Sequence, residues 1–374
     1  MQPPLYRVGA FNFERREKMK DEEYEFTLTD REAKIQSINE QYDLEHNAYI
    51  SFSGGKDSVV LSRLVDIALP NNKIPRVYFN TGIEYKAMVD FVKSLASKDD
   101  RFIIINSGVN IKKMLNENGY PFKSKQHSHN LSIYQSQKDK IVDCDDNKKI
   151  IENSEIKTRI VNRLWEEPYE EKYVDYHIPL TLVRYLGVEE TSTKFRCPDN
   201  LRFQFNKNYN LKVSDKCCYK LKKEIAAKYQ KESGKTITLT GMRKEEGGQR
   251  ASIGCIVTDK DNNLVKFHPL LVVNEEWENQ LIERERERIC ELYKEPYSFQ
   301  RTGCVACPYA LGLQEELERL YKYLPNEYYK AITIWKPVYD EYIRLGYRLK
   351  YYPHERGIQL TIDDFIEKEW FYDG

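Results

Sequence analysis

Short apolar runs alternate with helix-spaced apolar positions in the first third of the chain. Residues 48–52 form a run of strand type, and the apolar side chains at 59–68 recur at the spacing of a buried helix face. A second run covers 76–79, a helical pattern covers 85–97, and a third run covers 102–105. This order of strands and helices predicts an α/β fold, in which a parallel sheet carries helices on both faces.

The pattern is then interrupted and later returns. Residues 124–200 are polar and rich in Lys, Asp and Asn, and they predict a mostly helical insertion. A helix is predicted at 217–230 and a further strand at 236–240. Beyond Asn274 the chain is expected to be helical to its end, including the segments 276–293 and 314–323.

These patterns predict three parts in a chain that exceeds the usual size of one domain. Residues 1–45 form a polar N-terminal extension, and 46–275 form the α/β domain with its insertion. Residues 276–374 form a helical C-terminal region that carries a C-x-x-C sequence.

Opposite charges balance over the whole chain, which has 59 Lys and Arg against 59 Asp and Glu. This argues against a surface tuned as a whole for polyanions, although it leaves local basic patches open.

The start of the chain has no apolar run, and no stretch reaches the length of a membrane span. We therefore expect a cytoplasmic protein without membrane partners. Because disulfides are rare in the cytoplasm, its 8 cysteines need another explanation.

The loop between the first predicted strand and the first predicted helix reads Ser53-Gly54-Gly55-Lys56-Asp57-Ser58. A helix N-terminus holds anions through its backbone N–H groups and its dipole, and glycines let the backbone approach phosphate oxygens. Lys56 supplies a positive charge, the two serines supply hydroxyls, and Asp57 is placed to help hold Mg²⁺ beside the phosphates. The spacing differs from that of a Walker loop. The plainer alternative is a glycine turn that caps a helix.

Two arginines follow the predicted strand at 236–240. Arg243 and Arg250 are expected at the carboxyl end of a parallel strand, where ligands of open α/β sheets bind. Guanidinium groups there suit phosphate or sulfate. Alternatively, both are surface arginines that pair with Glu245 and Glu246.

Four of the cysteines form two close pairs, Cys217-Cys218 and the C-x-x-C of Cys304 and Cys307. Four thiolates suit zinc or an iron–sulfur cluster, and the spacing alone does not choose between them. Ordinary reduced cysteines without a metal are the third alternative. Nearby lysines would offset the charge of the thiolates, namely Lys216, Lys220, Lys222 and Lys223.

The loop at 53–58 resembles the PP-loop of the adenine nucleotide α-hydrolase superfamily, which includes ATP pyrophosphatases and phosphoadenylyl sulfate (PAPS) reductases. Further segments resemble the reductase-like branch, namely 80–84, 240–246 followed by Arg250, and 267–270 followed by 275–277. The resemblance implies an adenine nucleotide α-hydrolase-like fold. It also implies that Thr81, Gly82, Glu84 and Gly241 line the nucleotide pocket with the loop. Asn80 departs from the branch's usual Asp, which leaves the role of that position open.

The resemblance also bears on the cysteines. The two pairs resemble the 4Fe–4S motif of adenylyl sulfate reductases, which favours a cluster over zinc. Reductases of this family attack the sulfate with a cysteine in a C-terminal tail. Here the last cysteine is Cys307, and 368–374 contain none. Simple sulfate reduction therefore lacks its usual nucleophile.

Together these features predict an enzyme that binds ATP or an adenylyl sulfonucleotide with Mg²⁺ and a 4Fe–4S cluster. Attack at the α-phosphate would release pyrophosphate, with charge neutralised by Lys56, Asp57-bound Mg²⁺, Arg243 and Arg250. The cluster would serve sulfur transfer or redox work, with a donor or acceptor protein or a nucleic acid as partner. The alternatives are an assimilatory sulfonucleotide reductase that uses Cys255 or a partner's thiol, and a regulatory subunit without turnover.

One further segment has a weak link to nucleic acid. Residues 344–352 interleave basic and aromatic side chains, as single-stranded nucleic acid sites do. An amphipathic segment that packs its tyrosines on the core explains the same pattern better.

Overall fold

The computed structural model of the chain describes residues 19–137, 185–186, 196–206, 208–247, 250 and 252–356. The chain forms two compact units. The first unit comprises Met1–Tyr78, Met88–Ile105 and Tyr229–Glu291. The second unit comprises Phe79–Ala87, Asn106–Lys228 and Leu292–Gly374.

The first unit is built on a six-stranded, mostly parallel sheet whose strand order is β3-β2-β1-β4-β6-β5. The strands are β1 (Ala48–Ser51), β2 (Arg76–Asn80), β3 (Phe102–Asn106), β4 (Ile237–Leu239), β5 (Ile256–Thr258) and β6 (Leu264–Phe267). Strand β1 pairs in parallel with β2 and β4, and β4 pairs in parallel with β6. The predicted parallel sheet is therefore confirmed, with one addition. The edge strand β5 is antiparallel to β6, and the sequence analysis did not predict this hairpin.

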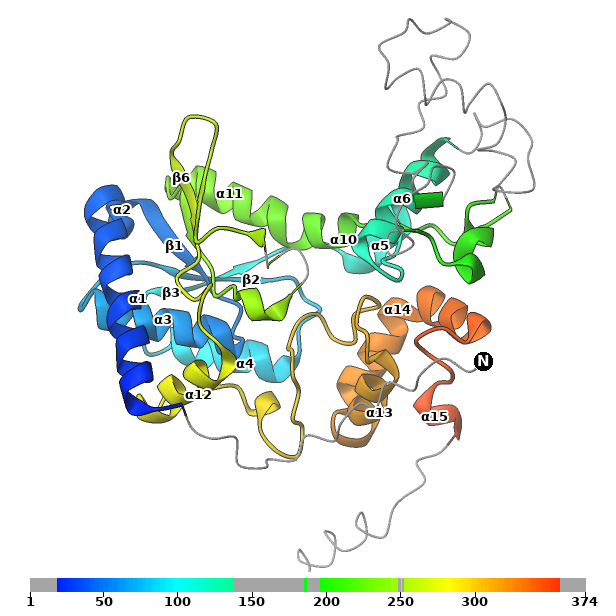
Figure 1. The fold of residues 1–374 in the computed structure, drawn as a ribbon. Helices are drawn as coiled ribbons and strands as arrows, with labels where there is room; N and C mark the ends of the chain where they lie inside the picture. Colours follow the sequence, from blue (N-terminus) through cyan, green and yellow to red (C-terminus); the bar gives the residue numbers. More distant parts are fainter. Residues whose placement is uncertain are drawn as a thin grey trace, which may run out of the picture. The chain divides into compact units, whose positions relative to one another are not determined.

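Helices cover both faces of the sheet, as predicted. Figure 1 shows α3 (Lys56–Ala68), α4 (Lys86–Ala96) and α12 (Glu275–Arg284) on one side of the strands. The C-terminal half of α11 (Glu224–Ser233) lies on the other side. Helix α3 buries the apolar positions that predicted it, among them Val60, Leu64 and Val65.

The long N-terminal helix α1 (Asp21–Tyr42) and α12 both pack against α3, and a short helix α2 (Leu44–Asn47) leads from α1 into β1. Tyr24 of α1 stacks on Trp277 of α12 with ring centroids 5.7 Å apart, and both side chains are buried. This aromatic pair joins the two helices that pack against α3. The part of the predicted extension at 1–18 lies outside the described residues.

Helix α12 is shorter than predicted. The expected helix at 276–293 ends at Arg284, and Arg286 takes a positive φ of 51°, which breaks the helical path. The chain then makes only a short 3-10 turn, η7 (Glu291–Tyr293). The alternating Glu and Arg of this segment have no apolar stripe to hold a longer helix against the core.

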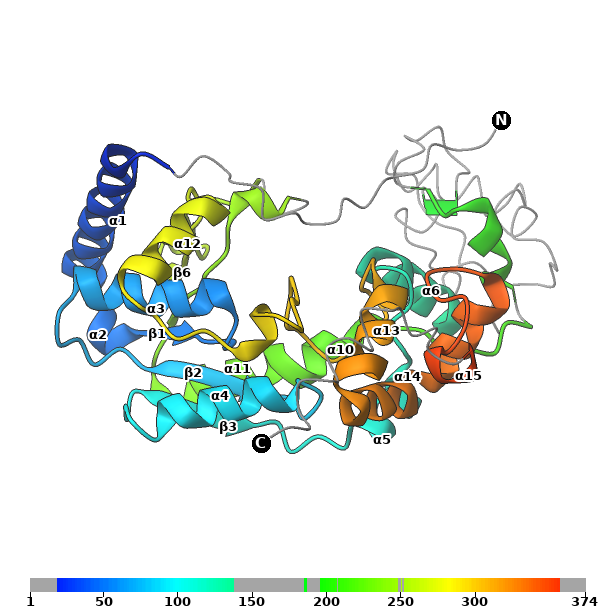
Figure 2. The same ribbon diagram turned by 90° about the horizontal axis from the view of Figure 1, so that it is seen from below.

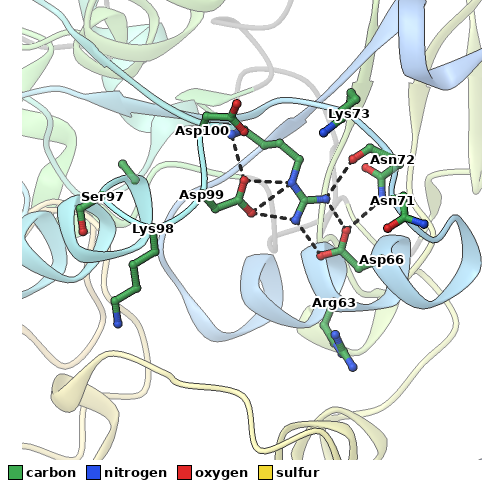
Figure 3. A pocket seen from close by; sticks show the side chains of 11 residues that line it. Arg63, Asp66, Asn71, Asn72, Lys73, Ser97, Lys98, Asp99 and Asp100 are labelled. Carbon is green, nitrogen blue, oxygen red and sulfur yellow. Dashed lines mark hydrogen bonds and ion pairs between the residues drawn. The ribbon is translucent and has the colours of Figure 1, made fainter.

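A charged network ties α3 to the amino ends of β2 and β3. Asp66 accepts hydrogen bonds from Arg76 at 2.6 Å and from Arg101 at 2.7 Å, and Arg101 also pairs with Asp99. Arg76 is completely buried, and burial lowers its pKa to about 10. Figure 3 shows Asp66 and Asp99 in the wall of a cavity of about 820 Å³. Because Arg101 is already bound by two carboxylates, we assign this network to stability.

The second unit is helical where the structure describes it. Its longer helices are α5 (Ile111–Asn118), α6 (Lys125–Gln137), α13 (Leu313–Tyr323) and α14 (Pro325–Leu345), and its short ones include η3 (Asp199–Gln204) and α15 (Pro353–Arg356). The predicted helix at 314–323 is confirmed as α13, which packs against α14 and α15 (Figure 2). Leu317 and Leu320 of α13 are buried, whereas Leu311, before the helix, is 86% exposed. Most of the predicted insertion, and residues 357–374, lie outside the described residues.

The predicted helix at 217–230 is present but contains an irregular turn. It runs as α10 (Lys216–Cys218), a π-helical turn η4 (Tyr219–Lys223) and α11. Turns of this kind shift the side chains that follow them around the helix and are frequent at functional sites. Within the described part of the chain, we find no helix long and apolar enough to cross a membrane.

Candidate functional site

The PP-loop, residues 53–58, connects the carboxyl end of β1 to the N-terminus of α3 in the first unit. Its serines brace the loop: the Ser58 hydroxyl donates to the Gly55 carbonyl at 2.7 Å, and the Gly55 N–H donates to Ser53 Oγ at 3.2 Å. The Ser53 and Ser58 hydroxyl oxygens are 3.2 Å apart. Helix α3 begins at Lys56, so this rigid loop presents the positive end of a 13-residue helix.

Two glycines permit close approaches around the loop. Gly54 has a φ of 76°, and a Cβ there would lie 2.3 Å from Met88 Sδ. A Cβ on Gly241, which follows β4, would lie 2.6 Å from the Asp57 carbonyl oxygen. The chain after β4 therefore rests directly on the first turn of α3. This contact brings the segment that carries Arg243 to the PP-loop.

Arg243 is a buried cation beside the PP-loop, with 7% of the residue exposed. Its Nη1 donates to Glu245 Oε2 at 2.7 Å, and its Nη2 lies 3.6 Å from Asp57 Oδ1. Its Nε lies 3.2 Å from Glu278 Oε2. Arg243 therefore pairs with Glu245, as the surface alternative expected, but it is not a surface residue. Three carboxylates from three segments surround it.

Glu278 is the residue here that the sequence analysis missed. It lies in α12 and is completely buried. Burial raises its pKa to about 9; the neighbouring Asp57 adds to the rise, and Arg243 opposes it. The segment 275–277 had been noted only as part of a motif, and an acidic residue in the first turn of a helix ordinarily faces solvent. One signal was available: Glu278 lies between Trp277 and Leu281, which mark the apolar face of α12.

Three more residues from the predicted loop and motifs belong to the first unit, namely Lys56, Arg250 and His268. Lys56 Nζ donates to Glu275 Oε1 at 2.7 Å, so the lysine of the loop is held by the first residue of α12. Arg250 lies in a turn in which its N–H donates to the Gly247 carbonyl at 3.3 Å. His268, at the end of β6, is buried and its Nδ1 lies 2.7 Å from Thr240 Oγ1.

The other predicted nucleotide-contacting residues, Thr81, Gly82 and Glu84, belong to the second unit. Glu84 is buried and accepts from the Thr81 N–H at 3.0 Å and from the Thr81 hydroxyl at 2.7 Å. Gly82 has a φ of 86°, and its N–H donates to Asn80 Oδ1 at 3.1 Å. An Asp at position 80 would offer the same acceptor, so Asn80 keeps the turn while removing a charge.

The segment 80–84 is paired with the C-x-x-C loop, residues 304–307. Glu84 forms an antiparallel bridge with Cys304, and the Val305 N–H donates to the Ile83 carbonyl at 2.8 Å. Lys222, from the π-helical turn, lies 3.7 Å from Glu84. Burial would lower the pKa of Lys222, but Cys304 and Glu84 outweigh burial and raise it.

Aromatic side chains of α14 hold the C-x-x-C loop in place. The Trp335 Nε1–H donates to the Val305 carbonyl at 3.0 Å, and the Tyr339 hydroxyl donates to the Ala306 carbonyl. The Tyr342 hydroxyl donates to the Pro308 carbonyl at 2.8 Å. All three aromatic residues are buried, and none had been predicted as part of the site. The C-terminal helices therefore shape this loop.

The four predicted metal-binding cysteines influence one another electrostatically in the second unit. The pKa of Cys217 is raised first by burial and then by Cys304, Cys218 and Cys307. Burial raises the pKa of Cys304 to about 11, although Lys222 opposes the rise. None of the four is in a disulfide. In the described residues, no group of three or more His, Cys, Asp or Glu side chains is gathered as a single metal ion would require.

Two other cysteines are poor candidates for chemistry. Cys197 is 2% exposed, and burial raises its pKa to about 12. Burial also raises the pKa of Cys255, whose thiol donates to the His268 carbonyl at 3.4 Å. An activated cysteine needs a lowered pKa, so neither thiol is prepared for attack. Cys290 is buried, and Cys144 lies outside the described residues.

The structure therefore collects the predicted site residues into two groups, one in each unit. The PP-loop, Gly241, Arg243 and Arg250 belong to the first unit, and Thr81, Gly82, Glu84 and the four cysteines belong to the second. The basic and aromatic segment at 344–352 contributes two side chains to the protein core, because Leu349 and Tyr352 are buried.

Comparison with known proteins matches one family model over most of the chain. The family model described as phosphoadenosine phosphosulfate reductase domain matches residues 47–161 and 176–310. A curated relative, an uncharacterized protein of Methanocaldococcus jannaschii, is 37% identical over 73 residues. That match covers 20% of this chain and 17% of the relative, so the chain spans only a small part of it.

Solved structures match more distantly. The PAPS reductase of Candida auris, in a phosphate complex, is 13% identical with a TM-score of 0.37, over 76% of this chain and 96% of that chain. The FMN adenylyltransferase of Candida glabrata, with FMN and an ATP analog, is 13% identical with a TM-score of 0.38, over 77% and 67%. We draw no argument from similarity at this level.

Proposed function

The chain belongs to the phosphoadenosine phosphosulfate reductase domain family, and from this premise we propose that it is an enzyme acting with adenine nucleotides. The observation that carries the proposal is the meeting of the PP-loop with Lys56 and the buried Arg243. A braced helix N-terminus with two cations suits a polyphosphate, because the amides and the charges act on the same anion. We propose that ATP or an adenylyl sulfonucleotide binds at this loop.

The chemistry that suits these residues is transfer at the α-phosphate. An oxygen of the acceptor attacks the α-phosphorus of ATP, the bond to the bridging oxygen of the β-phosphate breaks, and pyrophosphate leaves. Lys56 would exchange Glu275 for phosphate oxygens, and Arg243 would offset the charge that develops on them. Before the nucleotide enters, both cations are held by carboxylates, Lys56 by Glu275 and Arg243 by Glu245.

We also propose that Cys217, Cys218, Cys304 and Cys307 hold an iron–sulfur cluster. The donor set fits, because none of the four thiols is in a disulfide and members of both pairs raise the pKa of Cys217 through their charge. Cys217 and Cys218 lie in α10, and the loop that carries Cys304 and Cys307 is fixed by α14. Four cysteine thiolates are the usual ligand set of a 4Fe–4S cluster. When bound, a cluster would supply redox or sulfur chemistry. Lys222 would offset the charge of the thiolates.

The sulfur acceptor would be another molecule, either a partner protein or a nucleic acid, in a reducing cytoplasm. Assimilatory sulfonucleotide reduction is the competing function. It needs a reactive thiolate, and Cys255, the candidate in the chain, has a raised pKa.

The test is to incubate anaerobically purified protein with ATP and, separately, with each sulfonucleotide plus thioredoxin. We expect pyrophosphate from ATP and little sulfite from the sulfonucleotides. Sulfite release that is lost in Cys255→Ser would establish the reductase instead. Tight nucleotide binding without either product in the presence of candidate acceptors would indicate a regulatory subunit.

A further inference from the structure

The second unit carries a local excess of positive charge, although opposite charges balance over the whole chain. Residues 111–137 and 208–228, which contain α5, α6, α10 and η4, have ten lysines and no arginine against three acidic residues. The C-terminal segment 313–356 of the same unit has eight lysines and arginines against seven acidic residues. The excess therefore belongs to one part of the unit, where it creates a local field that attracts anions.

The helices that carry these lysines pack on one another. Helix α10 contacts α5, and a parallel bridge joins Tyr120 to Val213 (Figure 1). In α6, the Gln135 side chain accepts from the Val213 N–H at 3.0 Å. His129, also of α6, lies 3.4 Å from Asp215, so one of the three acidic residues already has a partner. The lysines of these helices therefore lie in one connected part of the molecule.

Five exposed lysines, which we call the lysine surface, are Lys112, Lys113, Lys125, Lys216 and Lys223. Of these five, Lys113 alone forms an ion pair with a described residue, at 3.8 Å from Glu117. Lys112 and Lys113 line a cavity of about 410 Å³ on α5 together with Asn110, Asn116 and Glu117. Ammonium groups beside side-chain amides offer several hydrogen-bond donors, so this surface suits an oxyanion such as phosphate.

An exposed tyrosine adjoins these lysines in the chain. Tyr219 is 53% exposed and follows Cys217-Cys218 directly, between Lys216 and Lys220. No other ring of the described residues stacks on it. A free aromatic ring beside cations is the combination that binds unpaired bases, because the ring stacks on a base while the cations hold the phosphates. An acidic protein suits the surface less well, because protein interfaces are enriched in arginine and depleted in lysine.

We propose that the lysine surface binds single-stranded nucleic acid, with phosphates on the lysines and an unpaired base on Tyr219. The inference rests on the proposed function for the role of this partner, since it selects nucleic acid from the two classes of acceptor named there. The segment at 344–352 suits this ligand less well. Its Arg344 is paired with Glu341, and Arg348 donates to the Pro308 carbonyl at 3.0 Å.

The experiment measures binding of the anaerobically purified chain to labelled single-stranded DNA, single-stranded RNA and duplex DNA by fluorescence anisotropy. Calorimetry follows ATP binding in parallel, and polyglutamate serves as a competing acidic polypeptide. One variant removes three charges from α5 and the start of α6, namely Lys112→Gln/Lys113→Gln/Lys125→Gln. Its control removes three exposed lysines from the C-terminal segment, namely Lys322→Gln/Lys336→Gln/Lys350→Gln.

A second pair of variants tests the ring. Tyr219→Ala removes the proposed stacking partner, and Tyr329→Ala is its control because Tyr329 of α14 is exposed to nearly the same extent, at 50%. Tyr219→Ala leaves every lysine in place, so it tests the site even where the triple variant fails to fold.

We expect single strands to bind more tightly than the duplex, and their relative affinities identify DNA or RNA as the partner. The triple lysine variant should bind about tenfold more weakly, and its slope of log affinity against log salt should fall by about 2, because each contact to a single-strand phosphate contributes about 0.7. Tyr219→Ala should bind about tenfold more weakly. Both controls should bind as the wild type does.

Four results would overturn the inference: no binding of either single strand, binding that is unchanged in the triple lysine variant, a duplex that binds as tightly as the single strands, or displacement by polyglutamate at an equal number of charges. The last result would identify an acidic protein as the partner. If ATP binds while the strands do not, this inference alone is wrong. If the strands bind while ATP does not, the proposed function is wrong and the nucleic-acid surface remains.

Discussion

Gly241→Ala tests how the segment after β4 positions the PP-loop. A Cβ at this position would lie 2.6 Å from the Asp57 carbonyl oxygen and 2.9 Å from its carbonyl carbon, whereas ordinary contact begins at 3.4 Å. The obstacle is backbone, so no side chain can rotate away. Either the first turn of α3 or the segment that leads to Arg243 must move. Overpacking of this kind costs about 1–3 kcal/mol of stability.

The same movement should reach the nucleotide site. Arg243 Nη2 is already 3.6 Å from Asp57 Oδ1, and a further separation would leave the loop without its buried cation. We expect the dissociation constant for ATP to rise about tenfold, or about 1.4 kcal/mol. Calorimetry gives the affinity, and urea denaturation gives the stability.

The control is Gly303→Ala, where no heavy atom lies within 4 Å of the added Cβ. This variant should bind ATP and unfold as the wild type does. If Gly241→Ala also matches the wild type in both measurements, the close approach does not position the loop, and the argument from Gly241 is wrong.

Four further predictions follow from the two units. Lys56→Ala should weaken ATP binding by about 1.5–3 kcal/mol, the usual value of a hydrogen bond to a charged group, as measured by calorimetry. Anaerobically purified protein should be brown and contain about four irons per chain, and Cys304→Ala should lose both properties; zinc in their place would refute the cluster. Asp66→Asn should lower the free energy of unfolding by about 3 kcal/mol in urea titrations, because the buried Arg76 loses its charged partner. Burial lowers the pKa of His127 from 6.5 to about 3, so the unfolded chain takes up a proton that the folded chain refuses. Stability should therefore fall as the pH drops from about 6.5 towards 3, and His127→Gln should flatten this dependence.

The features that were predictable from the sequence are encoded locally. The strand, loop and helix around 53–58 are contiguous, so apolar periodicity and two glycines were sufficient to predict them. The same holds for α13, whose apolar stripe identified it. The role of Asn80 could not be settled locally, because it depends on which backbone N–H the side chain accepts from in the folded turn.

The features that escaped prediction give weak local signals or depend on distant parts of the chain. The β5–β6 hairpin is local, with a turn in which the Asp259 N–H donates to the Asn263 carbonyl at 3.0 Å, but its strands of three and four residues are too short to show a clear alternation. The end of α12 is set by where the core ends, and the run of alternating charges gives no sign of it. Glu278 was missed for a similar reason. The acidic first turn of α12 suggests solvent although Trp277 lies beside it, and only the fold shows that Arg243 is close to Glu278.

The two groups of predicted site residues differ in the charges that surround them. In the first unit the proposed ligand is an anion, and the carboxylates of Asp57, Glu245 and Glu278 surround Arg243. In the second unit the proposed ligand would require thiolates, whereas burial, with Glu84 and Cys218 adding to it, raises the pKa of Cys304 to about 11. Lys222 opposes that rise, while Glu84 holds Lys222 by charge and Thr81 by hydrogen bonds. Thr81 and Glu84 also belong to the segment expected to border the nucleotide, so the carboxylate that lies beside Lys222 also holds the turn of that segment through its bonds to Thr81.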